Sequence, residues 1–452
     1  MAHESRGRRR GGASTTARPN ADTIRIAGAR PGLVPRRVAA REGVVAEGLA
    51  FPLVVGAAHW LLVQLVASLA YHRGTPYESS APQLYPGADL GGVADLFVAP
   101  LRQWDGLWYS YIADSGYGGG MEAKAAFWPL FPWLMDLGNR ATGWPVETVG
   151  YLIANVSFVA ALALLYRLVS IDFDQPVARR TVVALAFFPT ALFFSAVYTE
   201  SLFLLTVVGA LLAARLGNWG VAGVVGALAG LTRSYGVLLL LPFAVLFLQE
   251  RGWHPRGWFP RAIPVAFPAI GPAVFGWHLD RLHGDPLLFS NVQEQWNRYP
   301  SNPIATLRCG IEGCFALNGK SDGAEWGWVG TLAASPTWST LTARDFRVQV
   351  ADSDTLELVG TVLFLGLAAI GLRRLPLYLS VFAIPGLLIP LYQPSQVHAL
   401  MSMPRFGLTL FPLFIVLALL LGRRGLALPA LAVSTLLLIL LTAQFAQWYW
   451  VS

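Results

Sequence analysis

The segment LRQWDGLWYSYIADSGY, from Leu101 to Tyr117, combines residue types that can carry out chemistry. Asp105 follows Trp104 directly and Trp108 comes three residues later, so a carboxylate is placed near two indole rings. A carboxylate can take a proton from a hydroxyl group, as general-base catalysis requires, and the ring faces offer a surface for a sugar. The alternative interpretation is an aromatic belt at a membrane interface, with Asp105 as a solvated loop acid.

The composition indicates that this segment belongs to a membrane protein. The 452-residue chain is 55% hydrophobic and only 13% charged, with a mean hydropathy of +0.51. These values predict an all-α polytopic membrane protein. The net charge of +7 comes from short arginine clusters between apolar runs, which orient helices in a bilayer. No nucleic-acid partner is expected, because the spacing provides no contiguous basic surface.

About eleven apolar segments are candidate transmembrane helices, since a span needs about 20 residues, or about 17 where the bilayer adapts. They cover approximately residues 48–70, 148–167, 180–196, 200–215, 219–234, 236–250, 261–280, 355–372, 375–392, 404–422 and 427–446. The run FWPLFPWLMDLG from Phe127 is short and contains Pro129 and Pro132. It is typical of an interfacial or re-entrant helix that does not cross.

The arginine distribution predicts the orientation. With a cytoplasmic N-terminus, every inside loop carries arginine, as the positive-inside rule requires. Residues 1–43 are then a disordered basic cytoplasmic tail, and residues 44–452 form the transmembrane domain. Two long loops, about 72–147 and 281–354, lie on the extracytoplasmic side of what we expect to be the plasma membrane.

This topology brings polar residues from many helix ends to the outer face. Arg233 and Arg405 could hold a lipid phosphate there, with snorkelling to the interface as the alternative. The His and Asp residues between His278 and Asp285 combine imidazole and carboxylate groups, but they lack a fixed ligand spacing. A divalent metal is therefore compatible with the sequence but not indicated, and no cofactor is required.

Five motifs occur in a fixed order between about Phe51 and Phe414: WDGLWYSYIADSGY, FWPLFP, FFPTALFFSAVYTESLFLL, LAGLTRSYG and PRFGLTLFPLF. This order resembles the PIG-V-like mannosyltransferases, the family of the enzyme that adds the second mannose to the glycosylphosphatidylinositol anchor. The resemblance implies a GT-C-type helix bundle. It also implies a sugar donor carried on a polyprenyl phosphate, inversion at the anomeric carbon, and a catalytic acid in the first large loop.

The expected activity is therefore transfer of a sugar, most commonly mannose, to a hydroxyl of a glycolipid, polysaccharide or protein on the extracytoplasmic face. Asp105 is the expected base, and Arg233 and Arg405 bind the donor phosphate. The expected substrate-binding residues are Trp104, Trp108, Tyr198, Glu200, Asp285, Gln295, Trp296 and His398. The alternative is a transporter or lipid flippase for a glycolipid or other envelope precursor, which predicts internal repeats and polar groups at the membrane midplane.

The only two cysteines, Cys309 and Cys314, occur together as CGIEGC in the second long loop. An oxidising compartment lets nearby thiols pair. The sequence thus predicts a disulfide that closes a small loop, with buried free thiols as the alternative.

The topology can be tested with reporter fusions. Fusions at Arg180, Arg256 and Arg374 should report a cytoplasmic location, and fusions at Gly120 and Lys320 an external one, because arginine is retained on the inner side. A cytoplasmic signal at Gly120 would place Asp105 in the wrong compartment.

Overall fold

The computed structural model describes residues 42–71, 90–253, 255, 257–312, 353–422 and 425–451. No β-strand occurs among these residues. Most of the expected basic tail, parts of both long loops, and Cys314 lie outside them, so the tail stays a prediction. Cys309 is described, is buried on α12 and is disulfide-bonded, while its expected partner Cys314 lies outside the described residues.

The helices of the first half of the chain are α1 (Glu42–Tyr71), α2 (Gly92–Phe97), η2 (Ala99–Leu101), α3 (Asp105–Ser115), η3 (Glu122–Ala126), α4 (Leu130–Thr142), α5 (Val146–Asp172), α6 (Gln175–Ala186), η4 (Ala191–Phe194), α7 (Glu200–Arg215) and α8 (Trp219–Thr232). Those of the second half are η5 (Ser234–Leu239), α9 (Leu240–Arg251), η6 (Ile263–Ala269), α10 (Ile270–His283), α11 (Leu288–Asn291), η7 (Val292–Trp296), α12 (Pro303–Glu312), α15 (Ser353–Gly371), α16 (Leu377–Tyr392), α17 (Met403–Leu408), α18 (Phe411–Leu421) and α19 (Ala427–Ala446).

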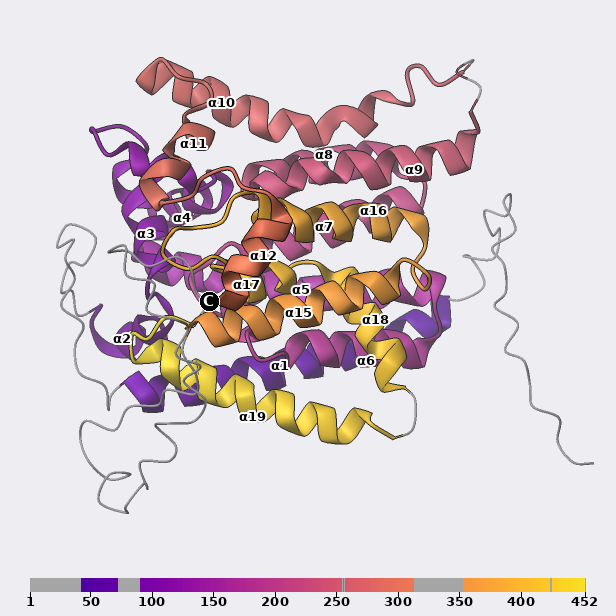
Figure 1. Cartoon of the computed structure of the whole chain (residues 1–452), viewed down its shortest axis with the longest axis horizontal. Coiled ribbons are helices and arrows are strands. Elements are labelled where there is room, and N and C mark those ends of the chain that lie inside the picture. Colours follow the sequence, from indigo (N-terminus) through magenta and orange to yellow (C-terminus); the bar gives the residue numbers. More distant parts are fainter. Residues whose placement is uncertain are drawn as a thin grey trace, which may run out of the picture. The chain divides into compact units, whose positions relative to one another are not determined.

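The long helices run side by side, and the short helices α2, α3, α4 and α11 gather at one end of them (Figure 1). Within the bundle α7 packs between α5 and α8, while α1 packs against α5 and α19. Five helical segments are long and apolar enough to cross a membrane: 50–71, 146–172, 234–251, 354–371 and 427–446. Helices α8, α16 and α18 are apolar but shorter, so the count of about eleven spans stays a prediction.

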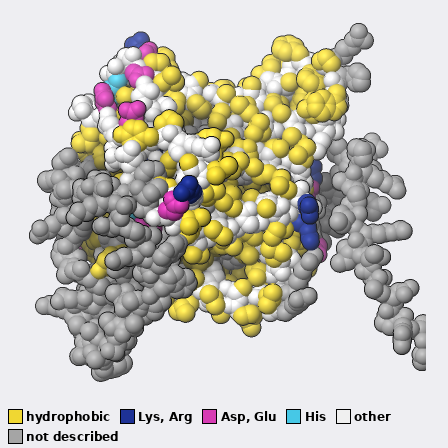
Figure 2. Space-filling view, in the orientation of Figure 1, with side chains coloured by type: hydrophobic (Ala, Val, Ile, Leu, Met, Phe, Trp, Pro, Cys, Tyr) yellow, Lys and Arg dark blue, Asp and Glu magenta, His cyan; other side chains and the backbone are white. Residues whose placement is uncertain are grey.

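The outer surface of the bundle supports the membrane interpretation. Apolar side chains such as Leu61 on α1, Val156 on α5 and Val433 on α19 are exposed. Figure 2 shows a broad hydrophobic surface with few charged side chains across the middle of the visible face. Exposed apolar surface on this scale is expected where lipid surrounds the protein.

The expected single span at 180–196 is wrong, because α6 ends at Ala186. Pro189 has no N–H with which to continue a helix. The buried segment that follows satisfies part of its backbone through other elements, as when the Val197 N–H donates to the Leu101 carbonyl at 2.9 Å. The expected span 236–250 lies within the segment 234–251 that is long enough to cross, although its first residues form η5. The expected spans 261–280 and 404–422 are each divided between two helical segments.

Polar contacts tie the arginine-rich turns together at the end of the bundle away from α3. The Asp172 carboxylate at the end of α5 pairs with Arg215 at the end of α7 and accepts a 2.6 Å hydrogen bond from Tyr378 at the start of α16. The Trp219 indole N–H donates to Glu250 at 2.8 Å, which joins the start of α8 to the end of α9. The sequence predicted these turns on one side of the membrane, and in the structure they lie together at one end of the helix bundle.

The opposite end of α8 carries Arg233 and is held against α10 by a close backbone contact. A Cβ atom on Gly271 would lie 2.3 Å from the carbonyl carbon of Gly230, so only glycine allows this approach. Arg233 itself has an extended backbone that ends α8 and begins η5. Because the backbone leaves helical geometry here, the Arg233 side chain lies beside the start of α7, where it pairs with Glu200.

Candidate active site

Asp105 is the first residue of α3, and the hydroxyl of Tyr198 fixes its backbone. The Asp105 N–H donates to this hydroxyl at 3.1 Å, and the hydroxyl donates to the Gln103 carbonyl at 3.0 Å. Burial, with Asp105 nearby, raises the pKa of Tyr198 well above its usual value. The hydroxyl therefore stays protonated and remains a donor. Tyr198, expected to contact substrate, instead lies behind Asp105 and positions it.

Asp105 begins a chain of four charged side chains that alternate in sign. Arg405 Nη1 lies 2.5 Å from Asp105 Oδ2, and Arg405 Nε lies 3.7 Å from Glu200 Oε1. Arg233 Nη1 lies 2.5 Å from the same Glu200 oxygen. Glu200, expected to bind substrate, is only 1% exposed and does not line the cavity described below, so it is a buried counter-charge.

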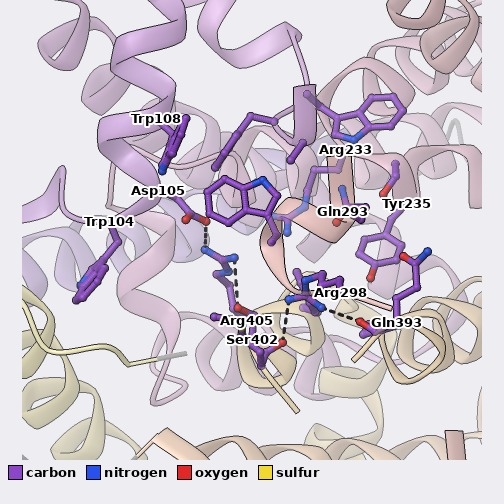
Figure 3. A pocket seen from close by; sticks show the side chains of 18 of the residues that line it. Trp104, Asp105, Trp108, Arg233, Tyr235, Gln293, Arg298, Gln393, Ser402 and Arg405 are labelled. Atoms are coloured by element: carbon purple, nitrogen blue, oxygen red, sulfur yellow. Dashed lines mark hydrogen bonds and ion pairs between the residues drawn. The ribbon is translucent and has the colours of Figure 1, made fainter. Parts of the chain in front are cut away.

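A cavity of about 680 Å³ opens above this network (Figure 3). Asp105, Arg233, Tyr235, Arg298 and Arg405 bring their polar groups to it. Aromatic side chains make much of its wall, among them Trp104, Trp108, Phe127, Trp296, Trp448 and Trp450. A volume of this size lies within the range of small-molecule sites, about 300–1,000 Å³. Asp105 is thus a partly buried cavity residue, which contradicts the solvated loop acid.

Arg298 differs from the other two arginines of the cavity. Its guanidinium donates to the backbone carbonyls of Gln393 at 3.0 Å and Met401 at 3.4 Å. Among the described residues no carboxylate lies within ion-pair distance of it, whereas Arg233 and Arg405 are both paired. Burial lowers the pKa of Arg298, because a desolvated cation without a close anion is unfavourable. An anionic ligand bound in the cavity would supply a counter-charge to the Arg298 guanidinium.

The structure brings together most of the residues that the sequence nominated. Those that line the cavity are Trp104, Asp105, Trp108, Arg233, Trp296, His398 and Arg405. Gln295 does not line it and is exposed, whereas Gln293 does. Asp285 is also absent from the wall, and its carboxylate accepts hydrogen bonds from the Leu287 N–H and the Asn291 amide, each at 2.8 Å.

Sequence reasoning missed Arg298, Tyr235 and the two C-terminal tryptophans. Tyr235 follows Arg233 within the same LTRSYG motif, so its position was a usable signal. Trp448 and Trp450 pack edge-on against Trp104, with ring centroids 5.9 and 5.3 Å away. They reach the cavity because the chain after α19 packs against the start of α3. No local sequence pattern predicts that contact.

Backbone strain is concentrated around the cavity. The described non-glycine residues with positive φ are Trp104, Asn297, Ser402 and Trp448. Three of them line the cavity, and Asn297 lies between the lining residues Trp296 and Arg298. Such conformations cost roughly 1–3 kcal/mol each and tend to persist at functional sites. The cluster independently marks this end of the bundle as the functional one.

The residues described thus define an integral membrane protein with a charged, aromatic-walled cavity at one end of a helix bundle. A family model described as mannosyltransferase (PIG-V) matches residues 49–250. This match confirms the resemblance to the PIG-V-like mannosyltransferases over the part of the chain that holds Asp105, Tyr198, Glu200 and Arg233. Arg298 and Arg405 lie beyond it.

Comparisons with curated proteins and with solved structures do not extend this family match. No match was found among curated proteins. One solved structure that is similar is the Archaeoglobus fulgidus oligosaccharyltransferase in complex with Zn and sulfate, with 13% identity, 86% of this chain and 53% of that chain covered, and a TM-score of 0.35. The chain spans about half the length of that protein, and the likeness is too weak to assign a fold or an activity.

The importance of the buried charge network can be measured through Glu200→Gln. Arg233 and Arg405 would lose their shared counter-charge, and breaking a buried ion pair costs about 3–5 kcal/mol. We expect a clearly lower melting temperature in detergent. The control is Glu312→Gln, which breaks the exposed Arg308–Glu312 pair on α12 and should leave the melting temperature unchanged. Equal melting temperatures for both variants would contradict a central role for Glu200.

Proposed function

We propose that the protein is an inverting, polyprenyl-phosphate-sugar-dependent glycosyltransferase of the GT-C type, and that the sugar is mannose. The observation that carries the proposal is the cavity itself, in which one carboxylate and three guanidinium groups meet beside tryptophan rings. The family match to mannosyltransferases supports the sugar and the reaction class. The acceptor is a hydroxyl of a glycolipid, polysaccharide or protein on the extracytoplasmic face.

Asp105 acts as the general base. One carboxylate oxygen holds Arg405, while the other accepts no hydrogen bond from the described residues and is available to an acceptor. The acceptor O–H transfers its proton to Asp105, and its oxygen forms the new bond to the anomeric carbon. The bond from that carbon to the phosphate oxygen breaks, and the polyprenyl phosphate leaves. Proton transfer of this kind contributes about 10²- to 10⁴-fold to a rate.

Arg298 and Arg405 hold the departing phosphate, with Arg233 bracing Glu200 behind them. This revises the sequence expectation of Arg233 and Arg405, because Arg298 alone among the three has no carboxylate partner in the described residues. Figure 3 shows Asp105 on one side of the cavity, Arg298 on the other and Arg405 between them. That separation suits an in-line displacement, in which base and leaving group act on opposite faces of the sugar.

The transporter interpretation fits the geometry less well. A transport site is expected near the bilayer midplane, between repeated helices. Here the cavity is lined by helix ends, such as the start of α3, the end of α8 and the short helix α17. Sugar transfer by the purified protein from a polyprenyl-phosphate donor, followed by mass spectrometry of envelope glycans from a deletion strain, distinguishes the two and identifies the acceptor.

The first catalytic prediction concerns Asp105→Asn. Asparagine keeps the size of the side chain and an oxygen for Arg405 but takes up no proton, so turnover should fall by about two to four orders of magnitude. Donor affinity should change little, because the phosphate is held elsewhere. Asp114→Asn is the matched control, since Asp114 is exposed on the same helix and does not line the cavity. A folded Asp105→Asn protein with near-parental turnover would remove Asp105 as the base.

The second concerns Arg298→Ala. Losing a charge-assisted contact to phosphate should raise the KM for the donor lipid by about tenfold or more. Arg298→Lys should restore part of the affinity, since it keeps the charge but not the planar donor geometry. The control is Arg308→Ala, whose side chain is 76% exposed on α12. If the donor KM is unchanged in a folded Arg298→Ala protein, the phosphate belongs to Arg405 and Arg233 as the sequence first indicated.

A further inference from the structure

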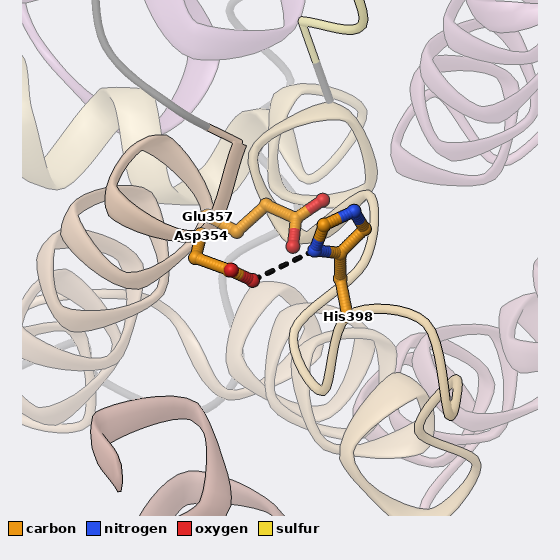
Figure 4. Close-up of side chains that lie close together, drawn as sticks. All are labelled: Asp354, Glu357 and His398. Atoms are coloured by element: carbon orange, nitrogen blue, oxygen red, sulfur yellow. Dashed lines mark hydrogen bonds and ion pairs between the residues drawn. The ribbon is translucent and has the colours of Figure 1, made fainter. Parts of the chain in front are cut away.

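Three side chains that the proposed reaction does not use form a compact group beside the cavity. Asp354 and Glu357 lie on the first turns of α15, and His398 lies on the segment between α16 and α17. One ligand atom from each lies within 4.8 Å of the other two. His398 Nδ1 is 2.8 Å from Asp354 Oδ1, and Figure 4 shows the Glu357 carboxylate directed at the same imidazole ring.

Glu357 is the unusual member of this group, because it is fully buried with only one of its oxygens bonded. Oε1 accepts a 3.1 Å hydrogen bond from the Ser402 N–H. Oε2 is buried and has no hydrogen-bond partner. The Trp450 indole N–H is close to the carboxylate, yet it also remains without a partner. A buried carboxylate with an unbonded oxygen is costly, and a cation at that oxygen would offset the cost.

We propose that Asp354, Glu357 and His398 bind a divalent cation. Two carboxylates and one imidazole are a donor set that suits Mn²⁺ or Zn²⁺. The ion would sit where Glu357 Oε2 now lacks a partner and would replace the hydrogen bond between Asp354 and His398 with bonds from both residues. The side chains of Asp354 and His398 are 44% and 28% exposed, so the ion has a path from solvent to the buried ligand.

The ion would also fix one wall of the cavity. His398 and Ser402 both line the cavity, and Ser402 is bonded to Glu357 through its N–H. Ser402 Oγ in turn accepts a 3.4 Å hydrogen bond from Arg405 Nη2. A cation bound to His398 and Glu357 would therefore clamp the segment that presents Arg405. This assignment rests on the geometry of the three ligands and not on the transfer reaction.

The sequence did not point to this site, since Asp354 and His398 are 44 positions apart. The expected metal alternative was the group from His278 to Asp285. Those residues do not come together as a three-ligand group in the described part of the chain. His283 is instead 3.0 Å from the Tyr117 carbonyl, and Asp285 bonds to its own turn.

The test is metal binding by the full-length protein in detergent after chelator treatment. Mn²⁺ is titrated by electron paramagnetic resonance and Zn²⁺ by calorimetry. We expect the parent protein to bind about one ion and to melt at a higher temperature when the ion is present. Glu357→Gln and His398→Ala should each weaken binding by about tenfold or more, since even residues that only support metal ligands have effects of that size.

Asp136→Asn serves as the control, because Asp136 pairs with Arg140 on α4 and belongs to neither the cavity nor the group. It should bind the ion as the parent does. Asp354→Asn changes a partly exposed side chain and tests the site even if the buried Glu357 variant fails to fold. The proposal is overturned if the parent binds no more Mn²⁺ or Zn²⁺ than Asp354→Asn and His398→Ala, or if ions do not change its melting temperature. Measurements of sugar transfer do not enter either outcome.

Discussion

The buried carboxylate of Glu200, together with the two guanidinium groups that approach it, is the interaction on which the rest of the site depends. Taking isolated charges out of water costs several kcal/mol each, and only close partners of opposite sign offset this. Glu200 begins α7, Arg233 ends α8 and Arg405 lies on α17. The three helix ends must therefore meet for any one of the charges to be tolerated. The packing of these helix ends also holds Arg405 against Asp105.

The requirement also explains the irregular backbone at this end. Continuous helices would carry Tyr198, Arg233 and Arg405 away from one another. The chain instead leaves helical geometry before Tyr198, changes from α8 to η5 at Arg233, and places Ser402 in a left-handed conformation just before α17. Non-helical backbone at such a depth is tolerated where it is buried in protein. The buried Val197 N–H is an example, because it donates its hydrogen bond to the Leu101 carbonyl within the protein.

The parts of the site that the sequence predicted are those whose position is set by a local motif. Asp105 follows directly on the strained Trp104, Glu200 starts a helix, and Arg233 ends one, so each is placed by a few neighbouring residues. Gln295, expected to bind substrate, is exposed and does not line the cavity, where η7 and the left-handed Asn297 change the direction of the chain. Gln293, two positions earlier, faces the cavity instead.

Arg298 shows why the remainder could not be predicted. Its segment is held by pairing with residues about a hundred positions later: the Tyr299 N–H donates to the Pro394 carbonyl, and the Gln396 N–H donates to the Asn297 carbonyl at 2.8 Å. Nothing near Arg298 in the sequence encodes that partner. Arg298 therefore reaches the cavity through a long-range backbone pairing, whereas Asp105 is placed by its neighbours in the sequence. Arg405 contacts Asp105 directly and also lines the cavity, so it links the base to the side of the cavity where Arg298 lies.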